Sequence, residues 1–323
     1  MKMQPLFMHR LLLNIRYTHS LCIRQTDGKI TPRKLVQYWQ KRFKEHGVPE
    51  PLESSEIIVS HALGSKTFHS LLPAVTQCPV SADQLKCIES MAQQRLKRIP
   101  VQYIIGVWDF LDLTLQMRPP VFIPRPETEE LVGFVLEGSR LLHCCSEPLV
   151  LEVGCGTGAV SLALLQRIPQ ARVIAVDKTN EAVSLTKDNA VSLGLQDKIQ
   201  VLVHDILTDS PENLLSLGAL DVVISNPPYI PTSDMSQLEP EIFRYEDHTA
   251  LDGGPDGMDV IRGLLQIAPQ LLKPGGHVFL EVDPRHPAKI QQWVENHPDI
   301  YLQHITTVRD FCGRPRFVHL HRQ

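Results

Sequence analysis

The stretch Asn226-Pro227-Pro228-Tyr229 follows an apolar run at 222–224 and Ser225. Proline has no backbone N–H and restrains the residue before it, so this stretch predicts a rigid corner where a buried strand ends. The Asn226 side-chain oxygen and the Pro227 carbonyl would be fixed hydrogen-bond acceptors. Two such acceptors suit a planar –NH₂ group, whose two hydrogens they can hold, and Tyr229 adds a flat face to pack against it.

A glycine-rich turn occupies the middle of residues 151–165, LEVGCGTGAVSLALL. Gly154, Gly156 and Gly158 have no Cβ, so the turn can be tight and a ligand can approach its backbone closely. About twenty residues later a second predicted strand ends at Asp177, where a carboxylate can accept hydrogen bonds from a ribose diol. Together the turn and the acid predict a site for an adenosine-containing cofactor.

Two interpretations remain open around this turn. Gly154, Gly156 and Ala159 also satisfy the dinucleotide pattern G-x-G-x-x-A, so a dehydrogenase remains an alternative on this motif alone. Asp205, which follows the third predicted strand, could accept from the exocyclic amine of an adenine ring, or could simply cap the next segment. His204 beside it is expected to be structural or solvent-facing.

From residue 148 onward strands and helices alternate, which predicts a doubly wound α/β fold with a parallel sheet. Ligands bind at the carboxyl ends of such strands, near the switch point between the first and fourth, so the turn and the corner should converge. The last two strands have no helix between them and should form an antiparallel C-terminal hairpin at the sheet edge. Predicted strands are 148–153, 171–177, 199–203, 220–225, 276–282, 301–308 and 315–321; predicted helices are 158–167, 180–193, 257–272 and 287–296.

The region before this sheet divides into a helical domain at 31–98 and a linker at 99–127, with the last domain at 128–323. Thr31 and Pro32 have the residue types that begin a helix. Further helices are expected at Ser54–Leu63 and from Ser81. In the linker, alternation over 101–118 predicts a β-hairpin, and the proline-dense 119–127 predicts a rigid extended segment before a helix from about Thr128.

The 323 residues carry a net charge of −4, which disfavours broad nucleic-acid binding, and contain no apolar run of the ~18 residues that a membrane helix needs. Seven cysteines without a CxxC pair indicate reduced thiols and no zinc cluster. Residues 1–26 are basic, contain no acid and include apolar patches, as in a mitochondrial presequence. The alternative is a disordered basic tail.

Three further segments carry a resemblance to a known family: VFIPRPETEELV (121–132), PVQYIIG (100–106) and ALDGGPDGMD (250–259). With the corner and the glycine turn, they resemble the HemK/PrmC family of release factor glutamine N5-methyltransferases. The resemblance runs from about Thr31 to about Leu320. It implies a Rossmann-like class I methyltransferase sheet, S-adenosylmethionine as cofactor and methylation of the glutamine in the Gly-Gly-Gln motif of a peptide-chain release factor.

The basic leader makes the chain most similar to the mitochondrial member of that family, which implies the matrix, or otherwise the cytoplasm. The helical domain 31–98 would then recognise the release factor. No membrane partner, stable nucleic-acid binding or metal is expected.

The resemblance also implies site residues. Asp177 would hold the cofactor ribose, Asp205 would contact the cofactor, and Asn226 would serve both cofactor and substrate. The remaining residues are the cofactor-lining Gly154, Cys155, Gly156, Thr157 and Gly158, the substrate-amide residues Pro227, Pro228 and Tyr229, and the cleft-covering Phe122, Arg125 and Thr128. After Glu281 the chain reads VDPRHP, where many members have a glycine and then a glutamine, so no role is assigned to 281–287.

The nearest rival is an N6-adenine methyltransferase of DNA or RNA, because adenine presents the same planar –NH₂ after base flipping. The acidic net charge and the lack of a basic, aromatic-interleaved segment outside the leader disfavour it. A non-catalytic scaffold should have lost Asp177 or Asn226, and both are present.

Overall fold

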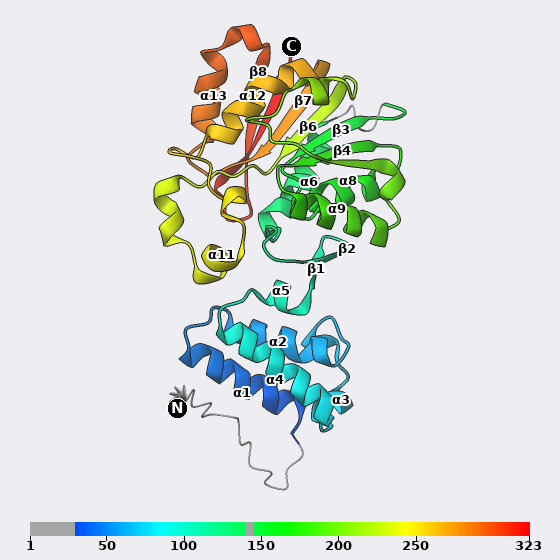
Figure 1. The fold of residues 1–323 in the computed structure, drawn as a ribbon, viewed down its shortest axis with the longest axis vertical. Coiled ribbons are helices and arrows are strands. Elements are labelled where there is room, and N and C mark those ends of the chain that lie inside the picture. The colour runs from blue at the N-terminus through cyan, green and yellow to red at the C-terminus, as the bar shows by residue number, and fades with distance from the viewer. Residues whose placement is uncertain (1–29, 140–141, 143–144) are drawn as a thin grey trace, which may run out of the picture.

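The computed structural model describes residues 30–139, 142 and 145–323. The expected presequence, 1–26, lies outside the described residues. A helical region and a larger α/β region follow one another along the chain, joined by a short helix and a hairpin (Figure 1). None of the helices in the described part of the chain has the length and apolar character of a membrane span.

The helical region packs around Trp39, Phe43 and Ile88, which are almost completely buried. Thr31 begins the first helix as expected, because its side chain accepts from Lys34 N at 3.4 Å. The helix expected from Ser54 begins three residues earlier, where proline suits the first turn. The helices are α1 Pro32–Glu45, α2 Pro51–Ala62, α3 Pro73–Gln77 and α4 Ala82–Leu96, the last begun by a capping box of Ser81 and Gln84.

The linker differs from its prediction. Residues 101–105 form a short helix, α5 (Val101–Ile105), and only β1 (Val107–Phe110) and β2 (Leu113–Gln116) pair as an antiparallel hairpin. Gly106 ends the helix in the left-handed conformation, with φ 72°, so it separates helix from strand. The Tyr103 hydroxyl of this helix donates to the Val121 carbonyl at 2.6 Å, which ties the helix to the proline-dense segment.

Seven strands form the main sheet in the order β5-β4-β3-β6-β7-β9-β8. The first five are parallel, and β9 and β8 add antiparallel at one edge, as expected. β7 begins four residues before its predicted start at 276. The bounds are β3 Leu149–Val153, β4 Arg172–Asp177, β5 Ile199–Val203, β6 Leu220–Ser225, β7 Leu272–Glu281, β8 Leu302–Arg309 and β9 Pro315–Arg322.

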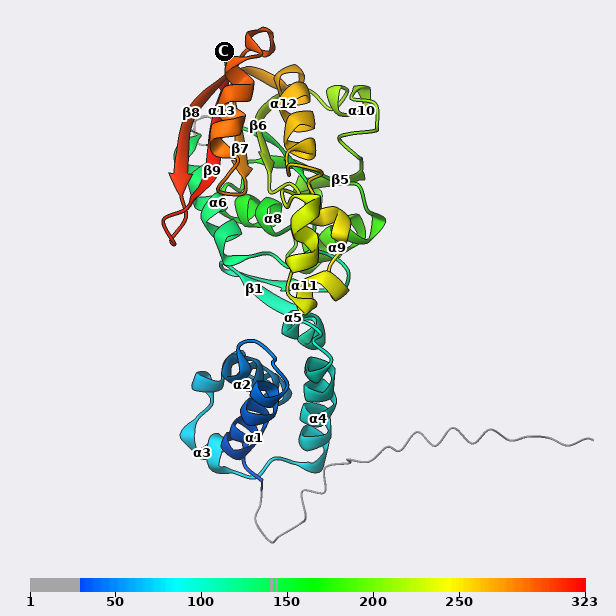
Figure 2. The same ribbon diagram turned by 90° about the vertical axis from the view of Figure 1, so that its left-hand side faces the viewer.

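Helices cover both faces of this sheet (Figures 1 and 2). Successive strand residues face opposite layers: Val150 packs in one core cluster, and Leu151 packs in the other. One face carries α6 Pro126–Gly138, α8 Ala159–Arg167 and α9 Asn180–Ser192; the other carries α12 Asp259–Leu271 and α13 Pro287–Glu295. α6 begins two residues before the expected Thr128, at a proline.

A helix that the sequence did not predict, α11 (Pro240–Tyr245), joins the helical region to the α/β region (Figure 2). Its buried Glu241 accepts hydrogen bonds from Arg95 at 2.8 Å and from Arg98 at 2.6 Å. Burial raises the pKa of this carboxyl, but the bonds from Arg98 and Arg95 outweigh burial and leave the pKa lowered. The stabilisation is therefore present above the usual glutamate pKa and is lost as the pH falls through the folded-state value.

Replacing Glu241 with alanine should lower the free energy of unfolding by about 3 kcal/mol, because Arg95 would remain buried without its counter-charge. Urea unfolding at pH 7.5 measures this. Glu239→Ala is the matched control: Glu239 also pairs with Arg98, but its side chain is 70% exposed, and its loss should cost less than about 1 kcal/mol. Equal losses in the two variants would contradict the assignment.

Candidate functional site

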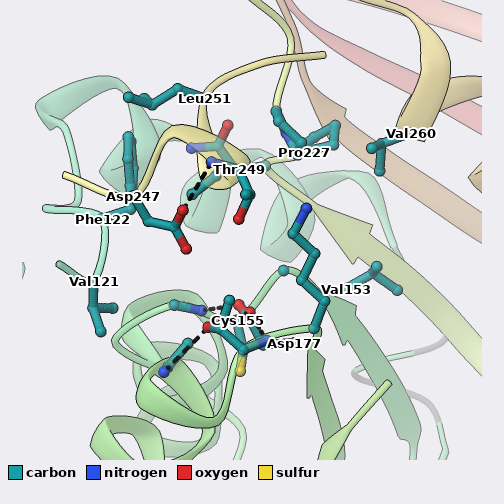
Figure 3. A pocket seen from close by; sticks show the side chains of 18 of the residues that line it. Val121, Phe122, Val153, Cys155, Asp177, Pro227, Asp247, Thr249, Leu251 and Val260 are labelled. Atoms are coloured by element: carbon teal, nitrogen blue, oxygen red, sulfur yellow. Dashed lines mark hydrogen bonds between the residues drawn. The ribbon is translucent and has the colours of Figure 1, made fainter. Parts of the chain in front are cut away.

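A pocket of about 370 Å³ opens at the carboxyl ends of β3, β4, β5 and β6, where the sequence placed the site (Figure 3). Its volume lies in the range typical of small-molecule sites. Of the predicted residues, these line it: Phe122, Arg125, Thr128, Gly154, Cys155, Gly156, Thr157, Asp177, Asp205, Asn226, Pro227, Pro228 and Tyr229. Gly158 is the predicted residue that does not.

The glycine turn is built from left-handed backbone, with φ of 77° at Gly154, 54° at Gly156 and 81° at Gly158. Only glycine adopts these angles without strain. A Cβ on Gly158 would also lie 2.9 Å from the Thr186 side chain. Gly158 therefore permits the close packing of the helix start, while the other two glycines face the pocket.

Asp177 is held firmly at the pocket floor (Figure 3). One carboxylate oxygen accepts from Gly156 N at 3.0 Å, and the other accepts from the backbone N–H and the hydroxyl of Thr179, each at 3.0 Å. Burial raises the pKa of Asp177, and the bonds from Thr179 and Gly156 oppose that rise. The oxygen bonded to Gly156 keeps a lone pair for a ligand, which fits a ribose diol.

Asp205 has the hydrogen bond of a turn-capping acid, and its contact with an adenine ring stays a prediction. It lines the pocket, and it also accepts a hydrogen bond from Leu207 N at 2.9 Å, as a turn-capping acid does. His204 lines the pocket and is buried, so it is not solvent-facing.

At the corner, Asn226 is oriented by a neighbour from α6. Its amide nitrogen donates to the Thr128 hydroxyl at 3.2 Å, which leaves the side-chain oxygen of Asn226 as an acceptor. Among the described residues no group donates to the carbonyl of Pro227. Tyr229 accepts from Arg316 Nη2 at 2.6 Å, and burial raises the pKa of its hydroxyl to about 12. The two acceptors of the corner, the Asn226 side-chain oxygen and the Pro227 carbonyl oxygen, are thus both uncharged groups.

The loop 250–259 supports the corner from behind. Ile230 exchanges backbone hydrogen bonds with Leu251 and Gly253. A Cβ on Gly253 would lie 2.6 Å from the Pro228 carbonyl, and one on Gly257 would lie 2.3 Å from the Tyr229 carbonyl. These glycines allow two backbones to touch, a contact that the sequence analysis did not identify.

Sequence analysis also missed the acids that follow α11. Glu246 is buried and accepts from Arg125 at 2.7 Å, which fixes the proline-rich linker over the pocket. Asp247 lines the pocket beside Phe122 (Figure 3) and binds the linker through its backbone N–H, which donates to the Pro120 carbonyl at 2.8 Å. The sequence around Glu246 and Asp247 has no clear helical or strand periodicity, so only the acidic residue types could have indicated a site there.

These features fit S-adenosylmethionine. Its adenosine would lie against the glycine turn, with the ribose at Asp177, and apolar residues such as Val121, Leu251 and Val260 provide walls (Figure 3). The corner at 226–229 lies in the same pocket, so a planar amide held there would be close to the cofactor. Within the described residues there is no group of His, Cys, Asp and Glu that could hold a metal ion.

Two family models match the chain: the PrmC N-terminal domain at residues 34–106 and a methyltransferase domain at residues 146–311. The human MTRF1L release factor glutamine methyltransferase is 53% identical over 293 residues, which cover 90% of this chain and 87% of that protein. The release factor glutamine methyltransferase of Mycolicibacterium smegmatis is 37% identical, with 84% of this chain and 91% of that protein covered.

Among solved structures, the release factor-specific protein-(glutamine-N5) methyltransferase of Alicyclobacillus acidocaldarius is 23% identical, with a TM-score of 0.39 over 62% of this chain and 94% of that chain. The two curated relatives agree in name, and each matches most of its own length to this sequence. The chain belongs to the family of release factor glutamine methyltransferases.

Proposed function

We propose that this protein methylates the side-chain amide nitrogen of the glutamine in the Gly-Gly-Gln motif of a peptide-chain release factor, using S-adenosylmethionine. The observation that carries this proposal is the pair of uncharged acceptors at Asn226 and Pro227 inside the pocket that fits the cofactor. The two relatives are both named as release factor glutamine methyltransferases, which supports the same substrate class.

Bound S-adenosylmethionine supplies an electrophilic methyl group on its sulfonium. The glutamine nitrogen is a weak nucleophile, because its lone pair is delocalised into the carbonyl. Asn226 and Pro227 accept its two hydrogens, fix its position and slightly hinder that delocalisation. Positioning of this kind can remove ~7–11 kcal/mol of a barrier in favourable cases. No charged base is needed beforehand, since the methylated nitrogen is acidic and loses its proton readily.

The domain roles extend this proposal. Residues 31–98 would recognise the release factor, 99–127 would link and cover the cleft, and 128–323 would carry out the transfer. The basic segment 1–26 would direct the protein to mitochondria. The human relative is named for the release factor MTRF1L, which supports a release factor as the substrate.

The alternative function is N6-adenine methylation of DNA or RNA, since the corner would hold an adenine amine equally well. The net charge of −4 disfavours it.

A labelling experiment distinguishes the two functions. The protein is incubated with methyl-labelled cofactor and a release factor, its Gly-Gly-Gln→Gly-Gly-Ala variant, or adenine-containing DNA. We expect label in the first alone. Label in DNA, or equal label in both release factors, would overturn the proposal.

Asn226→Ala should abolish most methylation, by on the order of 10²-fold in kcat, because one of the two acceptors is lost. Cofactor affinity should stay mostly intact, since Asp177 and the turn remain. Transfer to the release factor and binding of S-adenosylmethionine by calorimetry measure the two effects separately. Near-normal turnover in this variant would contradict the assigned role.

Asp177→Ala should instead weaken cofactor binding by at least tenfold, because it removes the predicted acceptor for the ribose. Asp205→Ala tests the remaining ambiguity in parallel: weaker binding would assign Asp205 to the adenine, and unchanged binding with lower stability would leave it as a cap. Calorimetry with S-adenosylmethionine distinguishes the two. Unchanged affinity in the Asp177 variant would overturn the ribose assignment.

A further inference from the structure

Glu281 is a completely buried acid at the end of β7, one residue beyond the pair Leu280–Ser225 that joins β7 to β6. It therefore lies level with Asn226, behind the corner. Neither of its carboxylate oxygens receives a close hydrogen bond within the described residues. Buried acids usually have such donors, so an acid retained here without them calls for an explanation.

Glu281 reaches the corner through two neighbours. Arg316 Nη2 lies 3.5 Å from one carboxylate oxygen, and the same nitrogen donates to the Tyr229 hydroxyl at 2.6 Å. The guanidinium also lies over the Tyr229 ring, 4.9 Å from its centre. Arg316 is thus held between the acid and the last residue of the corner.

The second neighbour is Thr128. Its hydroxyl oxygen accepts from the Asn226 amide nitrogen, so its own hydrogen is free to point elsewhere. The Thr128 hydroxyl is among the groups that favour the ionised form of Glu281. With that hydrogen turned toward Glu281, the lone pairs of the hydroxyl would face the Asn226 amide nitrogen.

We propose that Glu281 is a positioning residue that fixes both ends of the corner 226–229 for methyl transfer. Its carboxylate compensates the charge of Arg316 next to the amide site and orients the Thr128 hydroxyl. The inference rests on the proposed function and adds to it a residue that does not itself touch the substrate.

The electrostatics show that this acid is retained at a cost in stability. Burial raises the pKa of Glu281 to about 7, although Arg316 and Thr128 oppose that rise. Among the smaller effects, Glu127 raises the pKa and Arg125 lowers it. Because the folded-state pKa lies above the usual glutamate value, the folded state loses stability as the pH rises from about 4.5 to about 7.

The test compares the wild-type protein with Glu281→Gln, which keeps the shape and removes the charge, and Glu281→Asp. We expect Glu281→Gln to lose on the order of 10²-fold in kcat for the release factor, with S-adenosylmethionine affinity within about twofold. Its stability should fall less than that of the wild type as the pH rises from about 4.5 to about 7, because the titrating carboxyl is gone. Glu281→Asp should recover part of the activity.

Asp221→Asn is the matched control. Asp221 is a buried acid on β6, paired with Lys273 at 2.8 Å, at the opposite end of the strand from the corner. This variant should lose stability and keep its kcat. A double variant of Glu281→Gln with Arg316→Gln should be no worse in kcat than the worse single variant, because the two residues act as a unit.

Four results would each overturn the inference: wild-type kcat in Glu281→Gln, a loss explained by weaker cofactor binding, an unchanged pH dependence of stability between about 4.5 and 7, or additive effects in the double variant. Absence of release-factor methylation by the wild-type protein would count against the proposed function instead. The comparison of stability across pH 4.5 to 7 would then still test Glu281 directly.

Discussion

The adjacency of β3 and β6 in the sheet is the constraint on which the site depends. Val153 pairs with Ser225 at their carboxyl ends, and the Ser225 hydroxyl donates to the Val153 carbonyl at 2.6 Å. The next residue on each strand begins the glycine turn or the corner, so the two motifs meet although about seventy residues separate them in sequence. A ligand in one motif is necessarily beside a ligand in the other.

The corner is rigid for reasons that only its surroundings reveal. The prolines restrict its backbone, but Gly253 and Gly257 bring a second backbone within contact of it, and Thr128 orients Asn226. Glycine is required at those two positions because any side chain would meet a carbonyl oxygen. The acceptors are therefore preorganised, and little ordering remains to be done when an amide arrives.

The strands and the main helices could be predicted because the spacing of apolar residues along the sequence indicates which face of an element is buried. The site could be predicted where a motif lies at a strand end, as with Asp177 and Asn226. Residues 101–105 were misassigned, because five apolar and polar residues fit a strand as well as a helical turn. The contacts of Glu241 and Asp247 depend on segments distant in sequence, so no local pattern could reveal them. The domain boundaries and the individual site roles remain predictions.

The buried acids in and behind the pocket differ in how strongly their surroundings stabilise the ionised form. Burial raises the pKa of Glu152 to about 8, despite hydrogen bonds from Ser161, and raises the pKa of Glu281 to about 7. Both acids therefore favour the neutral form more than an exposed carboxyl does. Burial raises the pKa of Asp177 as well, although three donors from Thr179 and Gly156 oppose that rise. The acid beside the cofactor site is thus held by hydrogen-bond donors, and the acid behind the corner has Arg316 as its counter-charge.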